Sequence, residues 1–168
     1  ARNQIFRFTT DGGAATSPWA VLDQPIFNLA FDLAGRLWAT TGGGPLLELN
    51  PATGSVMNHY GDGLTIALAV HPDSGLIYVS SGDGVEIFDP ATLQFRHFSR
   101  DENLRVGSLA FAPDGTLWAV TWPDRRQVVR FNARGRAEVM LAFDSDIDSL
   151  TFAHPGTLTE NLLFVSHN

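Results

Sequence analysis

Three carboxylates stand close together near the end of the chain, in the run Asp144-Ser145-Asp146-Ile147-Asp148. Alternate side chains of an extended segment point the same way, so these carboxylates repel one another unless water or a cation separates them. Asp144, Asp146 and Asp148 are therefore candidate ligands for a hard divalent cation, Ca²⁺ or Mg²⁺. The run lacks the glycine and the distant glutamate of an EF-hand loop, and a solvated acidic loop is the alternative interpretation.

A second candidate site is the loop Trp122-Pro123-Asp124-Arg125-Arg126. An exposed Trp next to two Arg suits recognition of a ring, a glycan or a partner surface through stacking and bidentate contacts. Trp122, Arg125 and Arg126 are therefore candidate binding residues, together with Asp62 and Asp83 in two other expected loops. The alternative is that Trp122 folds back over a sheet and that water solvates the Arg side chains.

Residues of the usual catalytic motifs are missing from the sequence. The chain has no Cys, which excludes disulfides and thiolate chemistry, and its five His residues are dispersed. No two His stand at metal-pair spacing, and no Gly-x-Ser-x-Gly, His-Glu-x-x-His or phosphate-loop pattern occurs. His71 and His154 lie beside or near Pro and are expected in turns. The sequence thus favours a non-catalytic protein, with no catalytic residue assigned.

These candidate residues are separated by apolar segments that recur along the chain. A triplet of mainly apolar residues, followed by a turn and a second apolar run, occurs four times. The four triplets end at Phe31, Val70, Phe111 and Phe152. These residues are 39, 41 and 41 positions apart. A second series keeps step with the first: Phe6-Arg7-Phe8, Leu47-Glu48-Leu49, Ile87-Phe88-Asp89 and Arg130-Phe131-Asn132. The chain is therefore a tandem repeat with a period of about 40 residues.

Each repeat contains turn residues where short strands would end. In Ala112-Pro113-Asp114-Gly115, Pro presets φ for the first turn position and Gly supplies a positive φ. A second turn follows in Asn50-Pro51-Ala52-Thr53-Gly54 and in Asp89-Pro90-Ala91-Thr92-Leu93. No window shows a helical apolar stripe. Four antiparallel strands in about 40 residues predict a β-propeller blade, and a β-sandwich is the alternative.

The repeats divide the 168 residues into one propeller domain of about four blades. Three blades are expected at about 27–60, 66–98 and 107–143, with a split fourth blade made of 4–23 and 148–166. A half-blade leaves open strand edges, which favour association. The chain could close on itself as a four-bladed ring. The sequence favours instead a ring completed by other protein or by the rest of a longer chain, and a homodimer is one form of this arrangement.

The propeller would gather the loops between strands two and three and between blades on one face, around the mouth of the channel. These loops carry many acids: Asp23, Asp62, Asp83, Asp101, Glu102, Asp124, Asp144, Asp146 and Asp148. A channel mouth that is lined by negative charges concentrates the electric field and can attract a cation. The alternative is that Asp is simply a common turn residue.

Charge and composition exclude several classes of function. The net charge of −7 argues against binding to a nucleic-acid backbone, which needs clustered cations. The longest apolar runs are too short to span a bilayer. Composition permits a periplasmic or secreted location, which we expect for the protein.

The segments Phe111-Ala112-Pro113-Asp114-Gly115-Thr116-Leu117-Trp118-Ala119-Val120 and 31–40 resemble a motif of bacterial propellers. The motif is shared by NHL-like repeats, propellers of the SMP-30/gluconolactonase type and the streptogramin (virginiamycin B) lyases. The resemblance covers nearly the whole chain and implies a propeller. Its residues serve packing, and no catalytic set of those families can be matched here. We expect a scaffold for protein assembly or ligand binding, and the resemblance implies a metal-dependent hydrolase or lyase as the alternative.

Overall fold

The structure is a computed structural model. It describes residues 3–13, 17–63, 65–82, 84–99, 101, 104–123, 126–154, 156–160 and 162–167. In these residues all regular secondary structure is β-strand, and no helix is long and apolar enough to cross a membrane.

Twelve of the strands form three sheets, each an antiparallel meander of four strands. The first sheet contains β3 (Asn28–Phe31), β4 (Leu37–Thr40), β5 (Leu46–Leu49) and β6 (Val56–Tyr60). The second contains β7 (Leu68–Val70), β8 (Ile77–Ser81), β9 (Gly84–Asp89) and β10 (Gln94–Ser99). The third contains β11 (Val106–Phe111), β12 (Leu117–Thr121), β13 (Gln127–Phe131) and β14 (Ala137–Ala142). These sheets are the blades of a β-propeller, and we number them blade 1 to blade 3.

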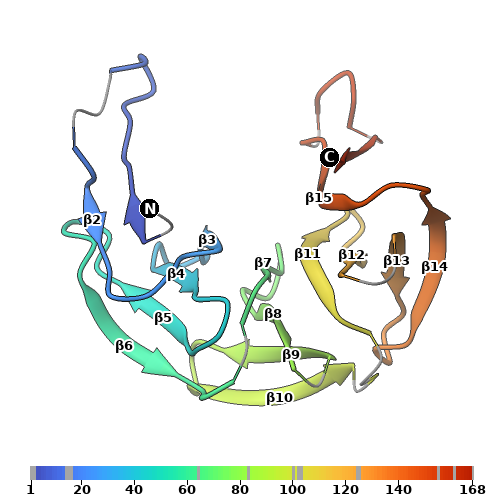
Figure 1. Ribbon diagram of the computed structural model, residues 1–168, viewed down its shortest axis with the longest axis horizontal. Helices are drawn as coiled ribbons and strands as arrows, with labels where there is room; N and C mark the ends of the chain where they lie inside the picture. Colours follow the sequence, from blue (N-terminus) through green and yellow to red (C-terminus); the bar gives the residue numbers. More distant parts are fainter. Residues whose placement is uncertain are drawn as a thin grey trace.

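The remaining four strands form two half-blades, one at each terminus. The N-terminal half-blade pairs β1 (Gln4–Ile5) with β2 (Ala20–Val21), and the C-terminal half-blade pairs β15 (Ile147–Phe152) with β16 (Leu163–His167). The two half-blades do not pair with one another, and Figure 1 shows them at opposite ends of an open arc. The split blade expected from the sequence is therefore not joined within one chain in this structure. β1 contains only Gln4 and Ile5, so the repeated residues Phe6, Arg7 and Phe8 lie outside regular strand structure.

The hairpin turns explain why each repeat folds locally into strands. Gly35, Gly75 and Gly115 have positive φ angles of 78°, 70° and 78°, a conformation that glycine adopts without steric cost. The amide of Gly115 donates to the carbonyl of Ala112 over 2.9 Å, which closes the turn between β11 and β12. The Pro-Asp-Gly signal in the sequence therefore marks a real turn.

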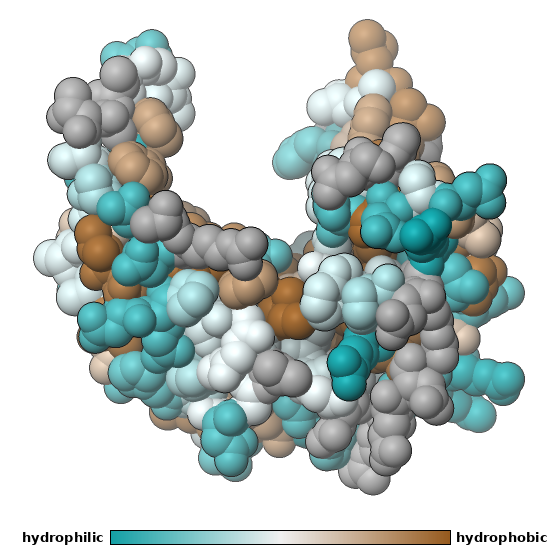
Figure 2. Space-filling model, in the orientation of Figure 1, coloured by the Kyte–Doolittle hydropathy of each residue, from teal (hydrophilic) through white to brown (hydrophobic). Residues whose placement is uncertain are grey.

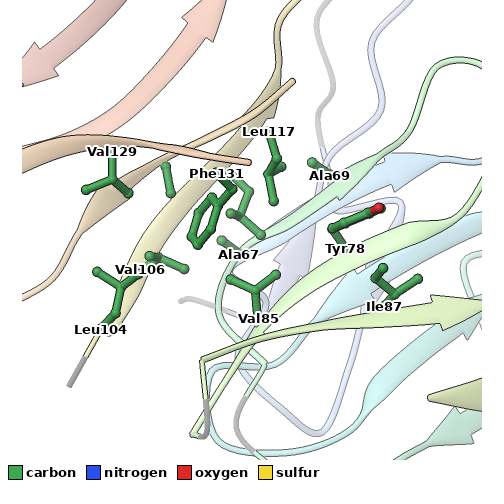
Figure 3. Packing of buried hydrophobic residues seen from close by; sticks show 12 residues of the cluster. Ala67, Ala69, Tyr78, Val85, Ile87, Leu104, Val106, Leu117, Val129 and Phe131 are labelled. Atoms are coloured by element: carbon green, nitrogen blue, oxygen red, sulfur yellow. The ribbon is translucent and has the colours of Figure 1, made fainter. Parts of the chain in front are cut away.

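The hydrophobic core is divided among the junctions between neighbouring blades. Four clusters of buried residues fill the four junctions, one cluster in each junction. Figure 3 shows the largest cluster, which lies between blades 2 and 3. The aromatic side chain on the second strand of a blade packs against the following blade. Trp38, for example, lies 5.3 Å from Phe88 between ring centroids, edge to face. Each blade is therefore stabilised mainly by its neighbours, as in other repeat proteins.

Candidate binding surfaces

The loop between β12 and β13 presents the indole of Trp122 to solvent. Its backbone amide donates to the carbonyl of Arg105 over 3.0 Å, and the peptide bond to Pro123 is cis. The side chain packs over Gly107, where an added Cβ would lie 3.1 Å from the Cβ of Trp122. Half of the Trp122 surface (50%) nevertheless remains exposed. The loop is thus anchored at its start and offers an aromatic surface.

Arg126 connects this loop to the acidic run that precedes β15. Its Nε lies 2.5 Å from Oδ1 of Asp146, and its Nη1 donates to the carbonyl oxygen of Asp144. Trp122, Arg126, Asp146 and Asp148 line one hollow of about 210 Å³ at the junction of blade 3 and the C-terminal half-blade. The structure therefore brings together two sets of candidate residues that are separate in the sequence.

One of the three carboxylates proposed as metal ligands has a basic partner in the structure. Asp146 is paired with Arg126, so its negative charge is already partly neutralised. Asp148 lies where the pairing of β15 with β16 shifts register, as Gly107 does in β11. Within the described residues, no group of three or more His, Asp or Glu side chains is placed to hold a metal ion. The acidic run acts here as a partner for Arg126.

The other candidate binding residues are not gathered in this hollow. Asp62 is exposed in the loop after β6 and does not line the hollow beside Trp122. Asp83 and Arg125 lie outside the described residues. The hollow therefore contains Trp122 and Arg126 of the predicted binding set.

Replacing Arg126 is expected to change the hollow with little effect on folding. The side chains of Arg126 and Asp146 are about half and two-thirds exposed, and exposed ion pairs contribute less than about 1 kcal/mol to stability. We expect Arg126→Ala to lower the free energy of unfolding by less than about 1 kcal/mol, measured by urea denaturation. A loss of several kcal/mol would show that Arg126 holds blade 3 to the half-blade.

A separate apolar surface covers the outward side of blade 1, and we call it the N-terminal end face. It contains Leu29 and Phe31 of β3 and borders a hollow of about 230 Å³ that Ile5 and Phe6 also line. Leu29 is 38% exposed, although the corresponding Leu68, Leu109 and Leu150 are only 3%, 6% and 6% exposed. The last three leucines are covered by the inner strands of the preceding blade. The N-terminal half-blade supplies no such strands.

The C-terminal end face is the side of β15 and β16 that points away from blade 3. Leu150 and Val165 pack against blade 3, so the alternating residues Thr151 and Phe164 point to the opposite side. Phe164 is 50% exposed, whereas Trp38 and Tyr78 at the same repeat position are 0% and 9% exposed. Figure 2 shows apolar residues along both arms of the open arc. The two end faces are thus the two sides of an interblade junction without their partners.

The repeat register of the sequence contains a signal for these end faces. Leu29 and Phe164 stand at repeat positions where the other blades have buried or half-buried side chains. Recognising them as exposed required knowing that each half-blade stays without its missing half in the folded chain.

Comparison with solved structures confirms the propeller fold and its resemblance to the bacterial propellers named above. A gluconolactonase from Xanthomonas campestris is 19% identical with a TM-score of 0.73, over 99% of this chain and 63% of its own. Virginiamycin B lyase from Staphylococcus aureus is 16% identical with a TM-score of 0.68, over 90% and 53%. An auxiliary nutrient binding protein from Bacteroides ovatus is 13% identical with a TM-score of 0.69, over 86% and 43%.

These similar propellers include both enzymes and a binding protein. The present chain spans less than two thirds of the length of each of them. No family model and no curated protein sequence matches the chain. The comparisons therefore establish the architecture and a bacterial set of structural neighbours.

Proposed function

We propose that this chain is a non-catalytic scaffold whose two end faces bind complementary propeller blades, with a second copy of the chain as the partner. The observation that carries the proposal is the exposure of Leu29 and Phe164 at positions where the other blades have buried or half-buried side chains. Exposed apolar patches rimmed by polar residues are typical of protein interfaces.

The two half-blades support this proposal because they are complementary. The C-terminal half-blade has the inner two strands of a blade, β15 and β16, and the N-terminal half-blade has the outer two, β1 and β2. Pairing β16 of one copy with β1 of another would build a complete four-stranded blade. It would also cover Leu29 and Phe31 with the side of the sheet that bears Phe164. Strand pairing at open edges is a common route of protein association.

The hollow beside Trp122 gives the scaffold a ligand- or partner-binding site on the loop side. Trp122 offers a ring for stacking, and Arg126 with Asp146 and Asp148 offers charges of both signs. Loops that carry binding residues on a rigid framework of strands are common in repeat proteins. In this proposal the blades hold the assembly together, and the loops select what it binds.

The assembly is tested by measuring the mass of the purified chain in solution by light scattering. We expect a species of about twice the 18.3 kDa of one chain at tens of micromolar protein. Phe31→Asp and Phe164→Asp should each give a monomer, because either charge would be buried at the junction without a partner.

Leu158→Asp is the matched control, because Leu158 is a fully exposed apolar residue that lies on neither end face. This variant should keep the mass of the unchanged protein. A monomeric, cooperatively folded chain at 100 µM would contradict assembly through the end faces, as would a dimer that Phe31→Asp and Phe164→Asp leave intact.

A further inference from the structure

The junction between blades 2 and 3 is open on the side of the hairpin turns, although the preceding junction is closed there. Between blades 1 and 2, Nη1 of Arg36 donates to the carbonyl oxygen of Pro90 over 2.9 Å and bridges the two blades. Trp38 lies fully buried beneath this bridge. In the next junction, Leu76 and Ala133 occupy the repeat positions of Arg36 and Pro90. The side chain of Leu76 has no hydrogen-bond donor, so it cannot form this bridge.

A groove of about 810 Å³ occupies the place where the bridge is lacking. Its volume is in the range of protein sites that bind small ligands. Tyr78, which replaces the larger Trp38 at this repeat position, lines the groove together with Phe98 and Phe111. The groove therefore follows from specific substitutions within the repeat.

Aromatic rings form the floor of the groove. The centroid of Tyr78 lies 5.1 Å from that of Phe98 and 5.0 Å from that of Phe111, both edge to face. His71 lies 4.8 Å from Phe111, and its Nδ1 accepts hydrogen bonds from the amides of Asp73 and Ser74. Tyr78 also belongs to the packed cluster of Figure 3, so the floor is supported from below by the core.

Charged side chains form the rim of the groove. Nη2 of Arg130 lies 2.8 Å from Oε2 of Glu138, which leaves other donors of this guanidinium available. Arg136 is exposed and has no ion pair among the described residues. Asp114 also lines the groove, and a hydrogen bond from the amide of Thr116 lowers the pKa of its carboxyl group, with a further contribution from the charge of Arg130. The rim thus offers both cationic donors and anionic acceptors.

A second hollow, of about 770 Å³, continues the groove along the outer edge of the two blades. The two hollows share Phe98, Arg136 and Ala137, and the second adds Arg96 and Arg134. Four of the eleven Arg residues of this acidic chain therefore line one continuous surface. Asp101, Asp114 and Glu138 also line these hollows, so four Arg side chains face three carboxylates and the surface has a small excess of positive charge. In a chain with a net charge of −7, this local excess favours an anionic ligand.

We propose that this groove binds a short acidic oligosaccharide, built of sugar units that carry carboxylates. The C–H faces of the sugar rings would lie on Tyr78, Phe98 and Phe111. The carboxylates would meet the Arg side chains, whose planar guanidinium groups bind carboxylates in a bidentate manner. Asp114 and Glu138 would accept hydrogen bonds from the hydroxyl groups, and the side-chain amide of Asn132 would donate one. The second hollow would extend the site over more than one unit.

The proposal is tested by isothermal titration calorimetry with trigalacturonic acid, using neutral maltotriose as the comparison ligand. We expect saturable binding of the acidic trisaccharide and at least tenfold weaker binding of the neutral one. Arg136→Gln should weaken binding of the acidic trisaccharide about tenfold, because it removes charge-assisted hydrogen bonds. Ala133→Trp should weaken binding without changing the charge, because it fills the groove from an exposed turn position.

Arg7→Gln is the matched control, because it removes the same charge from the N-terminal half-blade and should leave binding unchanged. Amide chemical-shift changes on binding should fall on Phe98, Phe111 and Ala137, not on Trp122 and Arg126. The absence of saturable binding, equal binding of maltotriose, or an Arg136→Gln variant with full affinity would each overturn the proposal. The binding measured with these variants does not depend on assembly of the chain, because neither Arg136 nor Ala133 lies on an end face.

Discussion

Gly135→Ala is expected to lower the free energy of unfolding by about 4 kcal/mol. Gly135 ends the turn between β13 and β14 with a positive φ of 74°. A Cβ at this position would lie 1.8 Å from the backbone carbonyl oxygen of Phe98 in the preceding blade. A backbone atom cannot rotate away as the end of a side chain can, so the turn or the whole blade must shift.

Gly35→Ala separates the cost of the turn conformation from the cost of this contact. Gly35 has a nearly identical φ of 78°, but an added Cβ would meet no atom within 4 Å. We expect this control to lose only about 1 kcal/mol, because the left-handed conformation alone is unfavourable for alanine. Urea denaturation of both variants measures the difference. Equal losses would show that blade 3 does not rest on β10 as closely as the structure has it.

Asp32→Ala is expected to cost about 3 kcal/mol, because a single buried carboxylate holds several groups of blade 1. Oδ2 of Asp32 accepts from Nε1 of Trp38 over 3.0 Å and from Nε of Arg36 over 2.7 Å. Its Oδ1 accepts from the amides of Ala34 and Arg36, each over 2.9 Å. Alanine would leave the buried indole N–H of Trp38 without an acceptor. It would also release Arg36, which bridges to blade 2 through Pro90.

For a chain of this length, a loss of this size corresponds to a melting temperature lower by roughly 6–12 °C, measured by calorimetry. Asp114→Ala is the control, because Asp114 belongs to the same kind of turn in blade 3 but is exposed. This control should lose less than about 1 kcal/mol. If the two variants melt at the same temperature, the hydrogen bonds of Asp32 do not stabilise the junction between blades 1 and 2.

The same carboxylate makes stability depend on pH. Burial alone would raise the pKa of Asp32, but hydrogen bonds from the Arg36 amide, the Trp38 indole and the Arg36 side chain outweigh burial and lower it below 3.8. The ionised form is thus favoured in the folded state, so its stabilising effect is complete above the unfolded pKa. This effect is lost as the pH falls through the lowered pKa of the folded state. The unchanged protein should therefore lose more stability than Asp32→Ala between pH 5 and pH 2.

The location of the turns and inner strands followed directly from the sequence. Hairpin turns need particular residues at particular positions, so Pro113, Asp114 and Gly115 predicted the turn between β11 and β12. The period of about 40 residues predicted blades because each blade must bury its two faces against similar neighbours. Trp38 and Phe131 recur in register with residues of the other blades, and both are buried between blades. Local chemistry and repetition were sufficient for this part of the fold.

The surfaces depended on contacts between residues far apart in the chain, which no local pattern specifies. Arg126 and Asp146 were both noticed in the sequence, but only the packing of the half-blade on blade 3 brings them within 2.5 Å. The groove beside Tyr78 arises from the absence of a bridge between two neighbouring blades, so it is a property of a junction and not of a segment. Leu29 and Phe164 carry the same apolar pattern as their buried counterparts, and only the open arc leaves them exposed. The sequence by itself thus determined what each blade is, and the tertiary structure decided which surfaces remain available, because burial depends on the neighbours that a segment meets.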